Sequence, residues 1–390
     1  MATISNIGPT QETPETVDVS FARFVGYFLW LGTAGFGGPI ALAGHMQRDL
    51  VEVRRWIGKQ DYVEGLALAQ LAPGPLAAQL AIYLGYVHSG IIGATAVAIA
   101  FVMPSFLMVL ALSAAYVHYG GLPWMQAIFY GIGAAVIAII ARSAFKLTKL
   151  SLGKDRLLWG IFVVLAVSTA WTSREIVWLF LVAGLVVLFV KATPTKAWFT
   201  RTRLSAFWFA VPTLPASDEF LRIFLFFAKA GMLVFGSGLA VVPFLYGGVV
   251  QEHHWLSDQQ FLDAVAVAMI TPGPVVITVA FVGYLVHGVL GATVAALGMF
   301  VPVYLIVVVL APSYKRWAKN PQINAFVQGV TAAATGAIAG AVIVLARRSI
   351  FDIATLAIVV ITFAILFRWK VPEPLLIGGA AVAGLLLKAI

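Results

Sequence analysis

The tripeptide Pro-Gly-Pro occurs twice in this chain, both times inside a long apolar stretch. The copies are Pro73-Gly74-Pro75 and Pro272-Gly273-Pro274, and they lie 199 positions apart. Proline removes a backbone hydrogen bond from a helix and clashes with the preceding turn, and glycine adds conformational freedom. The motif therefore interrupts a helix in an apolar setting, where the freed backbone groups must find partners within the protein.

The residues around the motif recur with it, which indicates an internal duplication. The offset of 199 also relates the pairs Trp56/Trp255, Val51/Val250, Arg23/Arg222, Gly32/Gly231 and Glu64/Asp263. We expect two homologous halves, residues 1–192 and 218–390, joined by a basic, proline-containing linker at 193–217. A repeated helix break in an apolar chain is typical of secondary transporters.

Composition places the chain in a membrane. Of its 390 residues, 61% are hydrophobic and 11% are charged. Soluble domains carry about 25% charged residues, so we expect an all-α polytopic protein embedded in the lipid bilayer, with about 10–13 membrane elements. The apolar elements are predicted near residues 21–44, 62–88, 91–117, 125–145, 157–172 and 176–191, and again near 220–247, 261–286, 289–312, 325–346, 352–367 and 373–388.

Several classes of function are excluded by what the sequence lacks. The chain has no cysteine, and its six histidines show no metal-ligand spacing, so no metal site is predicted. It contains no nucleotide-binding glycine-rich loop and no nucleophile motif, so we predict neither an enzyme nor a cofactor. The net charge of +9 is carried by short loops, which favours a role in membrane topology over nucleic-acid binding. The polar stretch at 1–20 is not a signal peptide.

The positions of Lys and Arg predict that the two halves are inverted. Loop 46–60 contains four basic residues, Arg48, Arg54, Arg55 and Lys59, whereas the equivalent loop 248–260 contains none. Under the positive-inside rule, the two loops face opposite sides of the membrane. This inversion requires an odd number of membrane passes per half, whereas six elements are visible. The numbers agree if the Pro-Gly-Pro element is re-entrant, entering and leaving the membrane on the same face. We expect loops 46–60, 146–156, 192–222, 313–324 and 368–370 on the cytoplasmic side, and loops 118–124, 248–260 and the N-terminus outside.

A resemblance to a known family rests on a spaced set of residues. Gly37-Gly38, Val51, Trp56, the first Pro-Gly-Pro, Gly85 and Gly93 resemble the signature of the chromate ion transporter family. The second half carries a weaker copy, with Gly236-Ser237 in place of the double glycine. The resemblance covers nearly the whole chain and fits the long, two-domain members. It implies an inner-membrane protein that exports chromate, driven by the membrane potential or the proton gradient, and in some members coupled to sulfate.

The helix breaks suit an oxyanion. Chromate and sulfate are tetrahedral dianions, and a helix that begins inside the membrane offers unpaired N–H groups and the positive end of its dipole. Proline suits the first helical turn, glycine allows close approach, and Gln79 and Thr278 could donate hydrogen bonds. The alternative is that each motif only kinks a packed helix. The predicted substrate-binding residues are Gly37, Gly38, Pro73, Gly74, Pro75, Gln79, Lys229, Gly236, Ser237, Pro272, Gly273, Pro274 and Thr278.

Ionisable residues within apolar elements are further candidates. A cation at Lys229 is costly unless it is used or paired, so we expect it to attract the dianion, to pair with Glu219 or Asp263, or to extend to the cytoplasmic surface. Glu64 and Asp263 lie near the starts of the predicted helices, where a negative charge interacts favourably with the helix dipole. The alternative is that they take up a proton during transport. The predicted coupling or gating residues are Glu64, Asp263, Arg23, Arg222, Trp56 and Trp255, with interfacial anchoring as the alternative for the Arg and Trp pairs.

Three functions stay open at this point. The first is an exporter of chromate with sulfate as competitor or counter-ion. The second is a carrier of sulfate or another oxyanion that chromate mimics. The third is a membrane protein that transports nothing, which has no evident need for duplicated helix breaks. The oligomeric state is also open, with a homodimer as one alternative.

Overall fold

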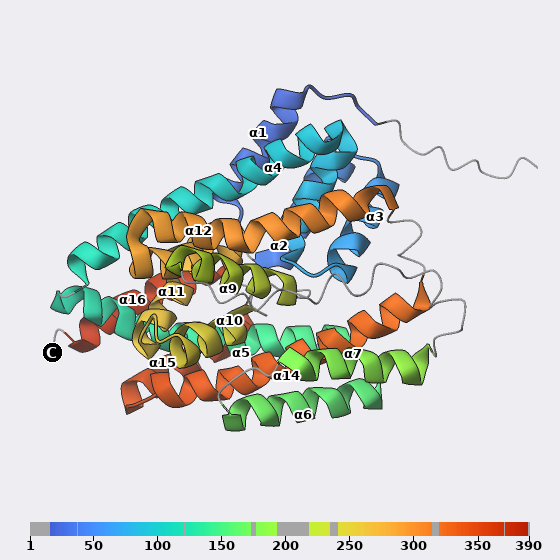
Figure 1. Cartoon of the computed structure of the whole chain (residues 1–390). Coiled ribbons are helices and arrows are strands. Elements are labelled where there is room, and N and C mark those ends of the chain that lie inside the picture. Colours follow the sequence, from blue (N-terminus) through green and yellow to red (C-terminus); the bar gives the residue numbers. More distant parts are fainter. Residues whose placement is uncertain are drawn as a thin grey trace, which may run out of the picture.

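The computed structural model is a bundle of helices, most of them running along one common direction (Figure 1). The structure describes residues 16–36, 38–120, 122–172, 177–192, 218–234, 241–313, 320–369 and 371–388. The helices of the first half are α1 (Phe21–Ala34), α2 (Gly38–Met46), η1 (Gln47–Val53), α3 (Lys59–Leu71), α4 (Leu76–Tyr119), α5 (Pro123–Leu152), α6 (Arg156–Thr172) and α7 (Val177–Lys191). Those of the second half are α9 (Glu219–Leu233), α10 (Val241–Leu245), η3 (Tyr246–Glu252), α11 (Asp258–Ile270), η4 (Val275–Ile277), α12 (Thr278–Leu310), η5 (Ala311–Ser313), α14 (Pro321–Ser349), α15 (Ile353–Arg368) and α16 (Glu373–Lys388).

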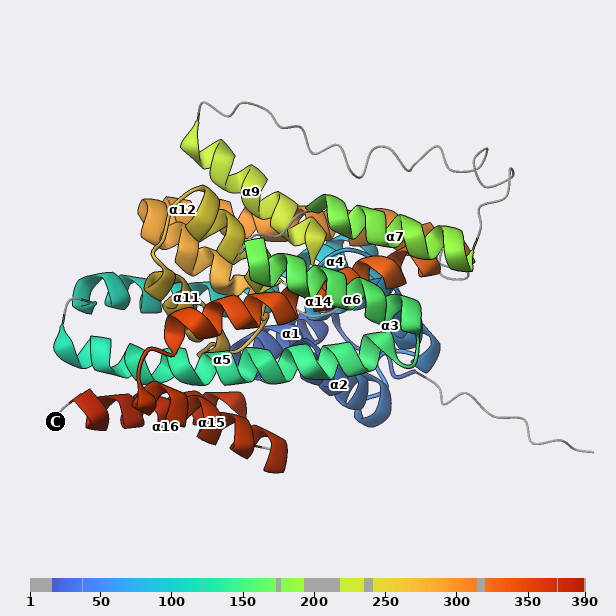
Figure 2. The same cartoon turned by 90° about the horizontal axis from the view of Figure 1, so that it is seen from below.

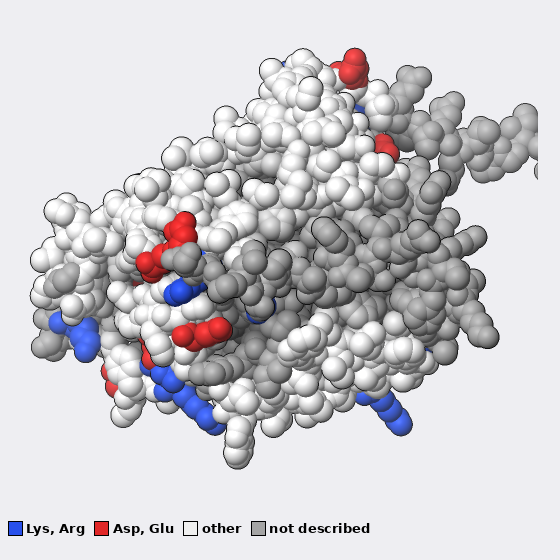
Figure 3. Space-filling view, viewed as in Figure 1, with Lys and Arg blue, Asp and Glu red and all other residues white. Residues whose placement is uncertain are grey.

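The surface and the helix lengths fit a membrane protein. The helical segments Leu76–Tyr119, Pro123–Leu152, Val275–Leu310 and Pro321–Ser349 are apolar and long enough to cross a bilayer. On the face shown in Figure 3, uncharged residues predominate and the charged side chains gather in a few groups. Large apolar side chains such as Trp171 and Ile353 are almost fully exposed, as expected where lipid replaces water.

The first Pro-Gly-Pro motif lies at the apex of a helical hairpin. Helix α3 ends at Leu71 and α4 begins at Leu76, with Gly74 between them at a φ of +140°, a value that favours glycine. Gly65 of α3 packs directly against Tyr83 of α4, because a Cβ atom added to Gly65 would lie 2.4 Å from the tyrosine ring. The two arms therefore lie side by side, as expected for a re-entrant element.

A second reversal follows within α4 and within α12. Ser89 and Gly90 leave the helical conformation, and His287 and Gly288 do so at the equivalent place. Across the first of these turns, a Cβ atom on Gly85 would lie 2.6 Å from the carbonyl oxygen of Gly93. The spaced glycines of the sequence signature therefore let the short arm pack against the long arm that follows it.

The long arms of α4 and α12 cross in opposite directions, which confirms that the halves are inverted. Near one end, the hydroxyl groups of Thr95 and Tyr304 share a hydrogen bond of 2.7 Å. Thr95 lies near the start of the long arm of α4 and Tyr304 near the end of that of α12, so the two arms run in opposite directions, as the colours in Figure 1 show. Because equivalent helices meet head to tail, the second half is an inverted copy of the first.

The basic loops gather at one end of the bundle, which we call the basic end and define by loops 54–58 and 153–155. Lys191 at the end of α7 forms an ion pair with Asp155, and its hydrogen bond lowers the pKa of that carboxyl group. The backbone N–H of Val17 donates to the carbonyl oxygen of Arg55, so α1 also begins at the basic end. The start of α1 therefore lies at the same end as loop 46–60, not at the opposite end as expected, and residues 1–15 lie outside the described part.

The second half begins at the opposite end, which we call the outer end (Figure 2). There, His287 Nε2 lies 2.9 Å from a carboxylate oxygen of Glu219, the first residue of α9. We expected loop 192–222 at the same end as loop 46–60, and for residues 218–222 that expectation is wrong. Residues 193–217 lie outside the described part. Arg348 also lies at the outer end, where an ion pair with Asp258 compensates its charge.

The arrangement of the ends can be tested by chemical labelling, because the chain has no native cysteine. We expect Val17→Cys and Lys154→Cys to react with a membrane-impermeant maleimide from the cytoplasmic side only, and Ser257→Cys from the outside only, since all three positions are exposed. Labelling in right-side-out and inside-out vesicles measures this, with the cysteine-free chain as the blank. Labelling of Val17→Cys from the same side as Ser257→Cys would contradict the topology.

Candidate functional site

The two Pro-Gly-Pro breaks are joined to the opposite halves by reciprocal backbone hydrogen bonds. The N–H of Gly74 donates to the carbonyl oxygen of Val234 at 2.6 Å, and the N–H of Gly273 donates to that of Gly35 at 2.8 Å. Gly35 directly follows α1 and Val234 directly follows α9, so the two acceptors occupy equivalent positions. Four interrupted helix ends therefore meet in two pairs, each pair containing one end from each half.

The donors that remain at these breaks are the first N–H groups of the helices that follow. The N–H groups of Leu76, Ala77 and Ala78 precede the first intrahelical bond of α4, and no side chain caps this end. All three residues are buried, as are Val275 and Val276 at the start of η4. Buried N–H groups at a helix N-terminus suit an anion, which also gains from the helix dipole.

Gln79 and Thr278 stabilise the breaks in this arrangement. Gln79 is fully buried, and its Nε2 donates to the carbonyl oxygens of Pro73 at 2.6 Å and Ala72 at 3.3 Å. The hydroxyl of Thr278 donates to the carbonyl oxygen of Val275 at 2.8 Å. Their hydrogens are engaged with backbone oxygens, so direct donation to an anion requires these bonds to exchange.

The predicted glycine turns are described only in part. Gly38 begins α2 with a φ of +75° and lies close to the end of α1 in the chain. Gly37, Gly236 and Ser237 lie outside the described residues. Their predicted part in binding therefore stays a prediction.

Lys229 lies on an exposed face of α9, with its Nζ atom 5.9 Å from the ring centre of Phe244. It does not pair with either acid considered for it. Glu219 contacts His287, and Asp263 accepts hydrogen bonds from Tyr116 and Gln259. The other predicted cations, Arg23 and Arg222, are exposed near the starts of α1 and α9, as interfacial anchors would be.

Both predicted tryptophans stack with the side chain two positions before them. The guanidinium carbon of Arg54 lies 4.7 Å from the ring centre of Trp56, a cation–π contact. At the equivalent place in the second half, the ring of His253 stacks on Trp255 at a centroid distance of 4.5 Å. The stacking geometry is shared, but the side chain on Trp56 is an arginine, which is always charged, whereas the one on Trp255 is a histidine.

The two predicted acids have the same neighbour in each half. Gln60 donates to Glu64 at 3.0 Å, and Gln259 donates to Asp263 at 2.9 Å. Glu64 is half-buried, whereas Asp263 is only 3% exposed. Asp263 also accepts a 2.8 Å hydrogen bond from the hydroxyl of Tyr116, which joins α11 to α4 of the other half.

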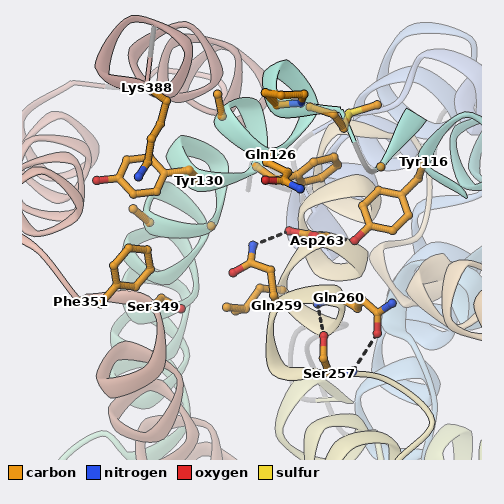
Figure 4. Close-up of a pocket in the computed structure, with 18 residues that line it drawn as sticks. Tyr116, Gln126, Tyr130, Ser257, Gln259, Gln260, Asp263, Ser349, Phe351 and Lys388 are labelled. Carbon is orange, nitrogen blue, oxygen red and sulfur yellow. Dashed lines mark hydrogen bonds between the residues drawn. The ribbon is translucent and has the colours of Figure 1, made fainter. Parts of the chain in front are cut away.

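Asp263 lines a pocket of about 730 Å³ at the outer end (Figure 4). Residues of α4, α5, α11, α14 and α16 form its walls, and polar side chains predominate among those labelled in the figure. The loops predicted to face outward, 118–124 and 248–260, both contribute to it. Its polar lining includes Tyr116, Gln126, Tyr130, Ser257, Gln259, Gln260, Ser349 and Lys388.

Tyr116 was not predicted from the sequence, although a signal for it exists. Tyr314 lies 198 positions after Tyr116, which is the offset that relates Gly85 to Gly283. A tyrosine at both equivalent positions would have added Tyr116 to the list of symmetric residues. Tyr314 itself lies outside the described residues.

Comparison with known proteins decides the family. The family model described as "Chromate transporter" matches residues 22–188 and again residues 221–385, one match in each half. The chain belongs to the chromate transporter family. It is therefore a transporter and not an enzyme, in agreement with the sequence prediction.

Curated members of the chromate transporter family align with nearly the whole chain. A chromate transport protein of Cupriavidus metallidurans is 61% identical over 373 residues, covering 93% of this chain and 92% of the relative. A probable chromate transport protein of Synechococcus elongatus is 57% identical over 380 residues, covering 94% and 95%. A chromate transport protein of Pseudomonas aeruginosa is 31% identical over 384 residues, covering 93% of this chain and 91% of the relative. No solved structure matches the chain.

The backbone at the first break can be tested by one substitution. We expect Gly74→Ala to lower the thermal stability of the purified protein and to abolish transport, because Gly74 has a φ of +140° and an added Cβ would lie 2.4 Å from Gln79 Nε2. The strain is about 1–3 kcal/mol. Thermal unfolding in detergent measures it, with Gly44→Ala of α2, where a Cβ meets no atom within 4 Å, as control. Equal melting of the two variants would contradict the prediction.

Proposed function

We propose that this protein is a secondary active transporter that exports chromate across the inner membrane. The observation that carries the proposal is the pair of Pro-Gly-Pro breaks, each hydrogen-bonded to a helix end of the opposite half, in a member of the chromate transporter family. Three relatives that align over nearly their whole length are named chromate transport proteins or probable ones. The shared architecture supports the same substrate here.

The proposed anion site lies at the two breaks. The buried first turn of α4 offers N–H groups without intrahelical partners, and so does the start of η4. These donors and two helix dipoles supply positive potential without a buried cation, which would be costly in the membrane. The residues proposed to form the site are Gly37, Gly38, Pro73, Gly74, Pro75, Gln79, Lys229, Gly236, Ser237, Pro272, Gly273, Pro274 and Thr278.

Electrostatics support export as the direction. The exposed side chains of Arg48, Arg54 and Arg55 lie at the basic end, which the positive-inside rule places in the cytoplasm, where they would attract anions. A membrane potential negative inside drives a dianion outward by about 4.6 kcal/mol per 100 mV. That free energy corresponds to an outside-to-inside concentration ratio of the dianion of roughly three orders of magnitude, so the potential alone could drive export.

The proton gradient is the second proposed driving force. The two carboxylates at Glu64 and Asp263 lie on the re-entrant helices, seven or more residues before the breaks, and are proposed to couple proton movement to transport. Arg23, Arg222, Trp56 and Trp255 are proposed to act in gating. Sulfate is proposed as competitor or counter-ion, because it is also a tetrahedral dianion.

The alternative substrate is sulfate itself, with chromate as a mimic. Both anions are tetrahedral and doubly charged, so the N–H donors at the breaks would serve either one. Discrimination between them depends on small differences in size and oxygen geometry. Transport measurements with both anions separate the two functions.

Flux measurements on the purified chain in liposomes test the proposal. We expect chromate movement driven by an imposed potential or pH gradient, with Pro75→Ala and Pro274→Ala lowering flux while the protein stays inserted. These prolines precede the helices whose N–H groups are proposed to bind the anion. Movement of sulfate with chromate acting only as an inhibitor would support the alternative substrate. No flux of either anion from inserted protein would refute the function.

A further inference from the structure

Asp263 is a buried carboxylate without a cation. It is 3% exposed, and within the described residues it forms no ion pair, only the hydrogen bonds from Tyr116 and Gln259. Burying an ionised carboxylate without an opposite charge is costly, and two neutral donors offset only part of that cost. A group in this setting can bind a proton if a proton can reach it.

The pocket at the outer end gives the proton a route. Figure 4 shows Asp263 at the pocket wall, between the side chains of Tyr116 and Gln259. The pocket has a volume of about 730 Å³ and is lined by hydroxyl and amide groups, so it can hold hydrogen-bonded water. Ser349 adds a buried hydroxyl that has no hydrogen-bond partner among the described residues. Such a group needs a partner, and water in the pocket would supply one.

The hydrogen bond from Tyr116 connects the charge of Asp263 to the contact between the halves. Tyr116 lies on the long arm of α4, and Asp263 lies on α11, the helix that leads to the second Pro-Gly-Pro break. A hydrogen bond to an ionised carboxylate is roughly twice as strong as one between neutral groups. Protonation of Asp263 therefore weakens a link between the two halves, on the helix that leads to the second break.

We propose that Asp263 is the site at which a proton from outside enters the transport cycle, and that Tyr116 positions the carboxylate and responds to its charge. The inference rests on the proposed function and deepens it. A proton passes from pocket water to the carboxylate, which becomes a neutral acid; its release toward the basic end restores the carboxylate, and the dianion leaves in the opposite direction. The inverted repeat places Glu64, with its own neighbour Gln60, as the counterpart in the other half.

The other charged and titratable groups of this region are already engaged or distant from the carboxylate. Lys388 of α16 lies 4.7 Å from the ring of Tyr130, whose hydroxyl donates to Asp352. On the helices packed against α11, the remaining groups near the outer end are the exposed His118 and Tyr119 of α4, which contact each other, Asp258 with Arg348, Tyr246 of η3 with Asp258, the exposed Glu252 of η3, Tyr284 of α12, and His287 of α12 with Glu219.

The decisive experiment compares the intact chain with Asp263→Asn in liposomes that contain a pH-sensitive dye. We expect the wild type to move protons against chromate. The variant, which resembles the protonated state, should lose chromate flux driven by a pH gradient but keep chromate–chromate exchange. Asp258→Asn, on the same helix but outside the pocket, is the matched control and should keep both. Wild-type coupling in Asp263→Asn, or equal losses in both variants, would overturn the inference.

Tyr116→Phe separates a positioning role from a purely structural one. The hydroxyl of Tyr116 stabilises the ionised form of Asp263, so in the variant Asp263 should stay protonated up to a higher pH. We expect the pH at half-maximal proton-driven flux to rise by about one unit, the size of a hydrogen bond to a charged group. A lower flux with an unchanged pH profile would assign Tyr116 a structural role and remove it from the proposal.

A spectroscopic measurement tests the proton site without transport. Infrared difference spectra of the purified chain should contain a protonated-carboxyl band that titrates with pH and is absent in Asp263→Asn. A band that does not change in Asp263→Asn would refute the site even if chromate is transported. If the wild type moves no chromate while the band titrates, the proposed function fails and the proton site stands.

Discussion

The fold depends on two hydrogen bonds between backbone groups of opposite halves, Gly74 to Val234 and Gly273 to Gly35. An interrupted helix in an apolar setting exposes N–H and C=O groups that lipid cannot satisfy. Here each half supplies the acceptor that the other half lacks. The halves are therefore mutually dependent, and a change in the conformation of one break is transmitted directly to the other half.

The two halves share a scaffold but differ in the groups that carry charge. Arg54 is matched by His253, Glu64 by Asp263, and Lys229 by the tryptophan at position 30. The backbone around these positions is equivalent in the two copies, including the paired π-helices η1 and η3. Duplication thus preserved the geometry of the breaks, whereas the charged groups at the two ends of the molecule diverged.

The sequence indicated the two-fold repeat, the re-entrant elements and the inversion, because each leaves a local signal in spacing, helix-breaking residues or loop charge. It could not indicate partners across the halves. The offset of 199 identifies Glu64 and Asp263 as equivalent, but Tyr116 meets Asp263 across 147 positions through tertiary packing alone. The end at which α1 begins was also not evident, because the contact that shows it, between Val17 and Arg55, joins segments 38 residues apart through tertiary packing.

Arg55 and His254 occupy equivalent loops and both adopt a positive φ, 54° and 52°. Few residues other than glycine tolerate this conformation, so the identical bend in both copies is inherited from one ancestral loop. The same loop conformation therefore stands at opposite ends of the molecule, next to Arg54 in one half and His253 in the other. Loop 46–60 contains four basic residues and loop 248–260 contains none, so the difference in charge between the two ends comes from side chains placed on one common backbone shape.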